Sequence, residues 1–234
     1  KLIADAIPEN VPELSKYLKG DETFTDIQGH WAENVIKTLA ESDKISGVGD
    51  GKFNPDGTVT RAEFLKMAMD SLGIVGHAYR DGECLDATND DWYCYYLQGA
   101  LDKDIIPKEM IENCNVTKVT KTLAEATDDK KAVTTDVNVY TGKFDGDKPI
   151  TREEMAAIAV RCKNYKMRRL TDWDNERRYP IFSFKDSDEI DEKYISDVVE
   201  AYNLNYIDGM EDGRFAPKEN LTRAQAAVVM NNLK

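Results

Sequence analysis

A short motif that pairs threonine with arginine occurs three times in the 234-residue chain. The copies read Thr60-Arg61-Ala62-Glu63, Thr151-Arg152-Glu153-Glu154 and Thr222-Arg223-Ala224-Gln225. Each copy predicts a capping box at the start of a helix, because the threonine hydroxyl accepts from the third helical N–H and the Glu or Gln side chain accepts from the threonine N–H. Helix initiation explains the threonine and the final residue of the motif, but it leaves the arginine unexplained.

The arginine of this motif falls in the first helical turn, where the positive end of the helix dipole disfavours a cation. One interpretation makes Arg61, Arg152 and Arg223 receptors for a carboxylate or phosphate, because a guanidinium beside free helix N–H groups offers paired donors. The other interpretation is a buried salt bridge to an aspartate that precedes each motif. These aspartates are Asp26, Asp81 and Asp186. The residues by themselves favour neither interpretation.

Each motif ends a longer pattern, so the chain is interpreted as a tandem repeat. The first copy contains Phe24-Thr25-Asp26, His30-Trp31-Ala32, Ile45-Ser46-Gly47 and Phe53-Asn54-Pro55. The last copy contains Phe184-Lys185-Asp186, Lys193-Tyr194-Ile195, Ile207-Asp208-Gly209 and Phe215-Ala216-Pro217. In this alignment Tyr194 stands where the first copy has Trp31. Apolar residues at helical spacing predict a helix, a loop and a second helix in each copy.

The middle copy is more divergent. It contains Tyr79-Arg80-Asp81, Asp91-Trp92-Tyr93, Ile105-Ile106-Pro107 and Phe144-Asp145-Gly146. The offset from the first copy is 61 residues at Trp92 but 91 residues at Thr151, so about 30 residues are inserted around 108–143. Alternating apolar residues at 133–139 predict a small hairpin within the insert. Lys108 stands where the other copies have Gly47 and Gly209. We therefore expect any binding groove that this copy forms to be altered or inactive.

The size of the repeating unit bears on the fold class. A unit this small cannot bury its apolar stripe alone, which favours three copies that pack their helices around a shared axis. We therefore expect an all-α fold with irregular loops. The expected divisions are a lead segment at 1–22, repeats at 23–76, 77–165 and 182–234, and a basic, aromatic connector at 166–181. The connector is interpreted as a solvated linker helix, with a place beside a binding groove as the alternative.

The net charge of the chain limits the classes of partner that it can attract. With 44 acidic and 31 basic residues the formal charge is −13, which repels nucleic acid, anionic lipid and anionic polymers at long range. An anionic ligand must therefore be bound locally. No segment approaches the roughly 20 apolar residues of a membrane-spanning helix, and residues 1–10 lack the apolar run of a signal peptide, so we expect a mature or excised portion of a protein.

Residue types that support catalysis or metal binding are scarce. The histidines are His30 and His77, and the sequence contains no nucleophile elbow, phosphate loop or metal-ligand cluster. We therefore expect no enzyme activity, no cofactor and no metal site. Disulfides and buried free thiols are equally compatible with the four cysteines, which are Cys84, Cys94, Cys114 and Cys162.

The order Phe-x-Asp, His-Trp-Ala, Gly, Phe-x-Pro and Thr-Arg-Ala-Glu resembles the S-layer homology family, as a set of three tandem repeats. The resemblance implies a pseudo-threefold arrangement around a central three-helix bundle, with ligand grooves between adjacent repeats. It also implies a secreted protein of the cell wall or S-layer that binds an anionic, peptidoglycan-linked secondary cell-wall polysaccharide. The ligand that it implies is a pyruvylated amino sugar whose carboxylate meets the motif arginine.

The resemblance assigns ligand-binding roles residue by residue. Arg61, Arg152 and Arg223 receive the anion, and a second set of residues shapes the pocket. This set comprises Asp26, Trp31, Asp81, Trp92, Asp186 and Tyr194. Gly47 and Gly209 permit close approach of the backbone or form a turn or helix C-cap, and Trp31 is either a platform for a sugar ring or a core residue. The alternative function is a protein-protein or lattice-assembly module that binds no glycan.

Overall fold

Three pairs of helices form the body of the molecule, for which a computed structural model describes residues 24–76, 83–88, 90–124, 133–167 and 184–234. The pairs are α1 (Glu33–Glu41) with α2 (Arg61–Ser71), α3 (Cys94–Leu101) with α4 (Arg152–Lys166), and α5 (Ile195–Asn203) with α6 (Arg223–Asn232). Short 3-10 helices occur at η3 (Lys108–Met110), η4 (Ser187–Glu189) and η5 (Glu192–Tyr194). The lead segment 1–22, Asp81 and connector residues 168–181 lie outside the described residues.

The second helix of each pair starts at a motif arginine. Thr60, Thr151 and Thr222 are the N-cap residues, and each threonine side chain accepts from the backbone N–H three residues later. The Glu or Gln at that third position accepts in return from the threonine N–H. The predicted capping boxes are therefore confirmed in all three copies.

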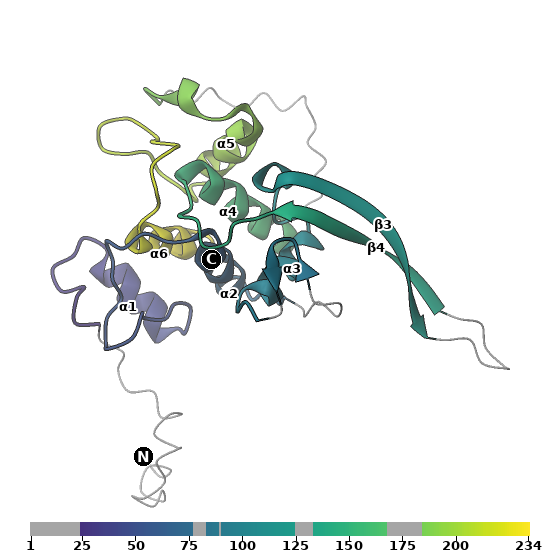
Figure 1. Cartoon of the computed structure of the whole chain (residues 1–234). Coiled ribbons are helices and arrows are strands. Elements are labelled where there is room, and N and C mark those ends of the chain that lie inside the picture. The colour runs from purple at the N-terminus through teal and green to yellow at the C-terminus, as the bar shows by residue number, and fades with distance from the viewer. Residues whose placement is uncertain (1–23, 77–82, 89, 125–132, 168–183) are drawn as a thin grey trace, which may run out of the picture.

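The expectation of an all-α fold is wrong, because the insert of the middle copy forms a long β-hairpin. β3 (Glu112–Ala124) and β4 (Val133–Lys143) pair antiparallel and project away from the helices (Figure 1). A short hairpin of β1 (Glu83–Cys84) and β2 (Ala87–Thr88) lies nearby in the sequence. Valine and threonine are frequent in both long strands, and β-branched residues favour extended backbone. The hairpin predicted at 133–139 is confirmed and is longer than expected.

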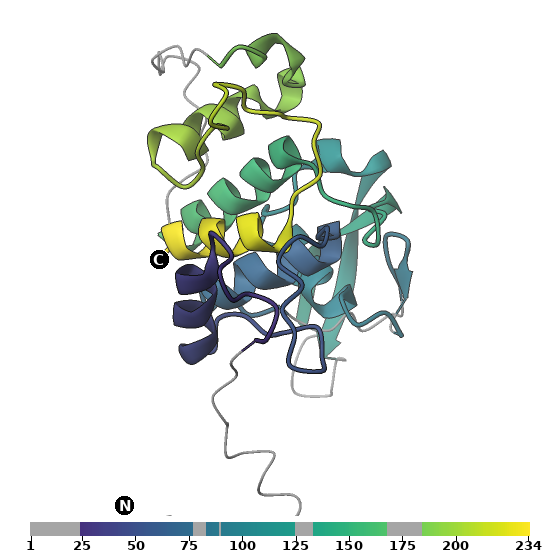
Figure 2. The ribbon, with the colours of Figure 1, turned by 90° about the vertical axis from the view of Figure 1, so that its left-hand side faces the viewer.

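The helix pairs pack in a cycle. The first helix of each pair contacts the second helix of another pair: α3 contacts α2, α5 contacts α4, and α1 contacts α6 (Figure 2). The helix α2 also contacts α4 and α6. Side chains that fill these contacts are almost fully buried, and they include Ile36, Leu39, Phe64, Leu65, Leu97, Ile158, Val198 and Met230. The three copies thus share one hydrophobic core.

Three backbone hydrogen bonds form a closed ring between the copies. The N–H of Val59 donates to the carbonyl of Leu221 at 3.0 Å, the N–H of Leu221 donates to Ile150 at 3.0 Å, and the N–H of Ile150 donates to Val59 at 2.9 Å. All three side chains are fully buried. Each residue lies just before a capping threonine, so the ring fixes the starting points of α2, α4 and α6 relative to one another.

The cysteines of the middle copy do not all pair. Cys114 and Cys162 carry free thiols, so a scheme of two disulfides that uses all four cysteines is wrong. Burial raises the pKa of the Cys162 thiol above its ordinary value. Burial, together with the nearby charge of Glu109, also raises the pKa of Cys114. Both thiols are therefore held in the protonated, less reactive form at neutral pH.

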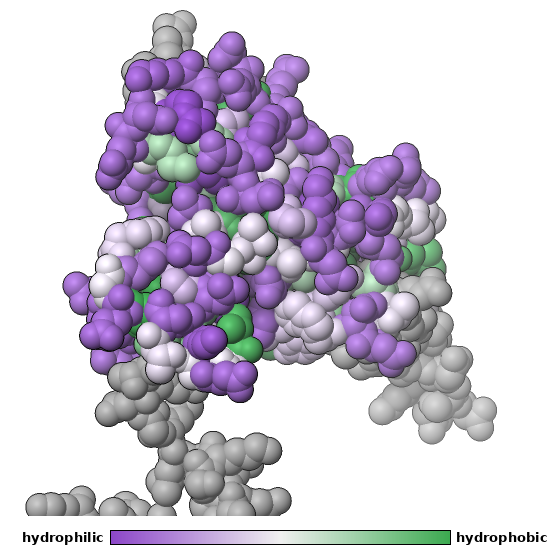
Figure 3. Space-filling model, turned by 60° about the vertical axis from the view of Figure 1, so that its left-hand side comes forward, coloured by the Kyte–Doolittle hydropathy of each residue, from purple (hydrophilic) through white to green (hydrophobic). Residues whose placement is uncertain are grey.

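Within the part of the chain that the structure describes, no helix has both the length and the apolar composition that a membrane crossing requires. Figure 3 shows one face of the molecule as mostly hydrophilic, with small and separate apolar areas.

Candidate functional site

Each motif arginine reaches across to another copy and binds the carbonyl of a phenylalanine there. Arg223 Nε donates to Phe53 O at 2.8 Å, Arg152 Nε donates to Phe215 O at 2.7 Å, and Arg61 Nη1 donates to Phe144 O at 2.6 Å. The guanidinium also lies over the ring of the same phenylalanine, at 4.8 Å, 5.1 Å and 5.9 Å from the ring centroid in the same order. The three arginines therefore connect the copies in a cycle.

An aspartate binds the same phenylalanine from the other side. The carboxylate of Asp26 accepts from the N–H of Phe53 at 2.9 Å and of Asn54 at 2.7 Å. Asp186 accepts in the same way from Phe215 and Ala216, at 2.7 Å and 2.8 Å. Partial burial acts to raise the pKa of Asp26, but the two backbone donors outweigh it, and the pKa is lowered. The predicted pairing of arginine with aspartate is thus indirect, through the backbone that both side chains bind.

In the middle copy this aspartate is Asp86. Its carboxylate accepts from the N–H of Phe144 at 2.7 Å and of Asp145 at 2.9 Å, which repeats the geometry of Asp26. The sequence analysis assigned this place to Asp81, which lies outside the described residues. Spacing could have found Asp86, because Asp26 precedes Trp31 by five residues and Asp86 precedes Trp92 by six, whereas Asp81 precedes it by eleven.

The first N–H groups of the motif helices are not free. The N–H of Arg223 donates to Gly57 O and the N–H of Ala224 donates to Pro55 O, both at 2.9 Å. The starts of α2 and α4 donate in the same way to loop carbonyls of another copy. The expectation that these N–H groups are free beside the arginine is therefore wrong, because they already have protein acceptors. At the starts of these helices, the guanidinium is the group that can still donate to a ligand.

Two of the three arginines retain such a donor. The Nη2 atom of Arg223 donates to Ser46 O at 3.0 Å, and that of Arg152 donates to Asp208 O at 2.8 Å. Among the described residues, no hydrogen bond is made by Nη1 of either arginine. Burial lowers the pKa of both guanidinium groups, although nearby carboxylates act to raise it. Both groups remain cationic at neutral pH, because the ordinary pKa lies far above 7.

Arg61 is different, because Glu154 neutralises it. Nε of Arg61 donates to Glu154 Oε2 at 3.2 Å, and Nη2 forms an ion pair with Oε1 of the same carboxylate. Both side chains are buried. With Nη1 bound to Phe144 O, all three guanidinium nitrogens of Arg61 have partners within the protein.

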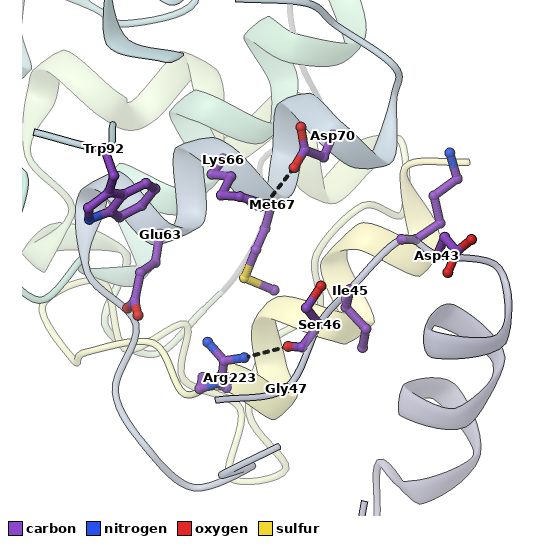
Figure 4. Close-up of a pocket in the computed structure, with 11 residues that line it drawn as sticks. Asp43, Ile45, Ser46, Gly47, Glu63, Lys66, Met67, Asp70, Trp92 and Arg223 are labelled. Carbon is purple, nitrogen blue, oxygen red and sulfur yellow. Dashed lines mark hydrogen bonds and ion pairs between the residues drawn. The ribbon is translucent and has the colours of Figure 1, made fainter. Parts of the chain in front are cut away.

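Two pockets lie where the copies meet, and each contains one of the other two arginines. The first-repeat pocket has a volume of about 250 Å³ and is lined by Ser46, Gly47, Glu63, Trp92 and Arg223 among others (Figure 4). The third-repeat pocket has a volume of about 290 Å³. Its corresponding lining residues are Asp208, Gly209, Gln225, Trp31 and Arg152. Every pocket thus takes its loop and helix from one copy, its tryptophan from a second and its arginine from the third.

The tryptophans of the pockets are exposed. Trp31 is 66% exposed and Trp92 is 51% exposed, which excludes the alternative that they are core residues. Tyr194 does not occupy the equivalent position in the last copy, contrary to the sequence alignment. It is the N-cap of α5, as Ala32 is of α1 and Tyr93 is of α3, so the equivalent of Trp31 is Lys193. Tyr194 is only 1% exposed and belongs to the core.

The remaining predicted site residues support the pockets. A Cβ on Gly47 would lie 2.6 Å from the ring of Phe24 and 2.5 Å from Lys52 O, and a Cβ on Gly209 would lie 2.5 Å from the ring of Phe184. These glycines therefore allow the pocket loop to pack closely against a phenylalanine of its own copy. Asp26 and Asp186 are absent from the lining of both pockets and hold the loop behind them.

A cyclic set of helix-loop-helix repeats, with pockets assembled from several copies, defines a repeat-built binding module. The family model described as S-layer homology domain matches residues 23–65 and 183–227. The first and third repeats of the chain are therefore S-layer homology domains. The matched segments contain the first and the last of the three arginine motifs. Each match ends within the helix that starts at its motif.

Several larger proteins contain a region similar to this chain. An amylopullulanase from Thermoanaerobacterium thermosulfurigenes is 33% identical over 226 residues, which is 96% of this chain and 10% of that protein. Exoglucanase XynX from Acetivibrio thermocellus is 34% identical over 222 residues, which is 94% of this chain and 17% of that protein. A cellulosome-anchoring protein from the same species is 36% identical over 63 residues, which is 26% of this chain and 14% of that protein. The chain thus spans less than a fifth of the length of these relatives.

Proposed function

We propose that this chain is an anchoring module that holds a larger protein at the bacterial cell surface by binding an anionic secondary cell-wall polysaccharide. The relatives support the anchoring part, because they are large enzymes and a cellulosome-anchoring protein in which the similar region is a small share. In this proposal the module binds and does not catalyse, and the three repeats with the boundaries given above act as one unit.

The observation that carries the polysaccharide part is the pairing of an exposed tryptophan with a partly bonded arginine in each of the two pockets. An indole face is a platform on which a sugar ring stacks, and the free Nη1 of Arg223 or Arg152 donates to a carboxylate such as that of a pyruvyl group. The arginine meets the anion at short range. A short-range contact is needed because the net charge of −13 repels anions at long range.

The groove of the middle copy, at the position equivalent to the two pockets, is inactive in this proposal. Every guanidinium nitrogen of Arg61 has a partner within the protein and its charge is paired with Glu154, while Lys193 stands in place of the tryptophan. Lys108 also stands where the other copies have a glycine. The proposed ligand sites are therefore the first-repeat pocket and the third-repeat pocket.

The test is retention of the protein by purified cell-wall sacculi with and without their secondary polymer. We expect polymer-dependent retention that falls at least tenfold in the Trp31→Ala, Trp92→Ala double variant, because each stacking contact contributes roughly 1 kcal/mol or more. Tyr165→Ala is the matched control, since Tyr165 is 43% exposed and lines neither pocket.

Three outcomes would contradict the proposal. Equal retention with and without polymer would favour a protein partner. Unchanged retention after acid removal of pyruvate would contradict the role of the arginines, and shortening of the polymer during incubation would indicate catalysis. Arginine variants are poorer probes here, because each motif arginine also joins two copies.

A further inference from the structure

The two pockets are equivalent in position but not in chemistry. The loop and helix residues of the third-repeat pocket lie 162 positions after their equivalents in the first-repeat pocket, as Gly209 does after Gly47. At the helix that forms the side wall, the charged pair Lys66 and Asp70 of α2 is replaced by Val228 and Asn232 of α6. The tryptophan and the arginine are retained, while the pocket loop also changes, with Asp208 in place of Ser46.

The side wall of the first-repeat pocket is polar. Lys66 Nζ lies 2.7 Å from Asp70 Oδ2, and the hydroxyl of Tyr96 donates to the same oxygen at 3.3 Å. Both charged side chains are more than one-third exposed, and they border the pocket with Asp43 and Glu63 (Figure 4). Covering them with an apolar group would remove water from charges without replacing its hydrogen bonds, which is unfavourable.

The side wall of the third-repeat pocket is apolar. Val228 and Val229 face the pocket together with Met155 and Tyr206. Asn232, the polar residue of this wall, donates its amide to Tyr206 O at 3.4 Å, so its N–H is directed to the backbone of the pocket loop. A methyl group placed against this wall leaves water and gains dispersion contacts.

We infer that the two pockets select different sugar residues: the third-repeat pocket takes an anionic hexose with a methyl-bearing substituent such as an N-acetyl group, and the first-repeat pocket takes one with a polar or amino group in its place. This inference rests on the proposed function. Val228 with Asn232, and Lys66 with Asp70, are the specificity-determining residues. The retained tryptophan and arginine hold the sugar ring and its carboxylate in both pockets.

Single-pocket variants separate the two sites. Trp92→Ala leaves the third-repeat pocket intact, and Trp31→Ala leaves the first-repeat pocket intact. The probes are the methyl glycosides of a pyruvylated N-acetylhexosamine and of the same pyruvylated hexosamine with a free amine, measured by isothermal titration calorimetry. We expect Trp92→Ala to prefer the N-acetyl probe by roughly tenfold, the discrimination typical of a methyl group in an apolar pocket. Trp31→Ala should prefer the amino probe, because a polar substituent leaves Lys66 and Asp70 of its intact pocket hydrogen-bonded to water or to the sugar.

An exchange of side walls tests the assigned residues directly. Val228→Lys with Asn232→Asp, made in the Trp92→Ala background, should abolish the preference for the N-acetyl probe while retaining a cooperative unfolding transition. Lys66→Val with Asp70→Asn, in the Trp31→Ala background, should create that preference. Equal probe ratios in the two pockets, within twofold, would overturn the inference and leave the proposed function intact. A wild-type protein that binds neither probe nor the wall polymer would overturn both.

Discussion

Arg223 and Phe53 lie 170 residues apart in the sequence, yet Arg223 Nε donates to the Phe53 carbonyl at 2.8 Å and the guanidinium lies over the phenylalanine ring. Because Asp26 accepts from the N–H of Phe53, both polar groups of one loop residue are bound by charged side chains, one from its own copy and one from another. Arg223 thus joins two copies of the repeat, and this structural role does not depend on a ligand.

Loss of this arginine should destabilise the protein. Arg223→Ala removes the donors to two carbonyls, Phe53 O and Ser46 O, and we expect it to lower the free energy of unfolding by about 2–4 kcal/mol. Arg214→Ala is the control, because Arg214 is exposed and its ion pairs lie on the surface, where such pairs contribute little. Urea denaturation measures both values, and an equal loss in the two variants would contradict the structural role.

The ion pair of Arg61 and Glu154 should be sensitive to loss of one partner. Glu154→Ala leaves a buried guanidinium without its counter-charge, and we expect a loss of about 3–5 kcal/mol in urea denaturation. Glu63→Ala removes the equivalent residue of the first copy, which caps its helix but bonds to no arginine, so we expect a loss of about 1 kcal/mol. If the two variants lose the same amount, the ion pair contributes nothing beyond the capping box.

A buried carboxyl between α4 and α5 should make stability depend on pH. Burial raises the pKa of Asp197 to about 6, although Arg161 acts to lower it, and the charges of Glu200 and Glu109 act to raise it further. Because this pKa is above the value of about 3.9 in the unfolded chain, the contribution of Asp197 to stability is fully present below pH 4 and is lost as the pH rises through 6.

Asp197→Asn isolates this effect, because it keeps the shape of the side chain and removes its titration. Relative to wild type, the variant should gain up to about 3 kcal/mol of unfolding free energy between pH 4 and pH 8. Other carboxylates titrate in both proteins, so the difference between them is the informative quantity. A difference that does not vary with pH would show that Asp197 stays ionised throughout this range.

The β3–β4 arm should be dispensable for both fold and binding. Val116 lies opposite Tyr140 near the base of the arm, so the residues between them can be replaced by a two-residue Asn-Gly turn. Because Tyr140 packs against the hydrophobic core, it is kept with its partner Val116, and only residues 117–139 are replaced. We expect the free energy of unfolding to change by less than about 1 kcal/mol, because this outer part of the arm packs mainly on itself. Polymer retention should also be unchanged. Loss of retention by the folded variant would place the arm in the binding site.

Local signals in the sequence predicted the starts of the motif helices, because a capping box depends on residues within one turn. Thr60, Thr151 and Thr222 each define such a start. The same analysis identified the arginines and tryptophans that line the pockets, since repetition alone singled them out. The alternation at 133–139 also indicated the hairpin. The fold class, however, was inferred from the repeats alone and left the strands of this hairpin out.

The errors arose where position depends on loop length or on distant parts of the chain. Tyr194 is the aromatic residue next to the position of Trp31, and the segment from Asp186 to the N-cap of α5 is two residues longer than the segment from Asp26 to the N-cap of α1, so the sequence does not fix the alignment there. Asp86 was missed because the motif was expected at the offset of Asp81. The acceptors of Arg61, Arg152 and Arg223 lie 83, 63 and 170 residues away, so no local pattern could predict them.

The ring of Val59, Ile150 and Leu221 has a consequence for synthesis of the protein. The first copy emerges from the ribosome long before Leu221 and Arg223 exist to complete it, and the entropy of closing so long a loop makes this the late step of folding. Until then the partly made chain exposes apolar surface that the finished molecule buries, which is the state that chaperones protect. A chain that stops before residue 221 lacks both Arg223 of one pocket and the helix wall of the other, so binding competence appears only after the third copy has been synthesised.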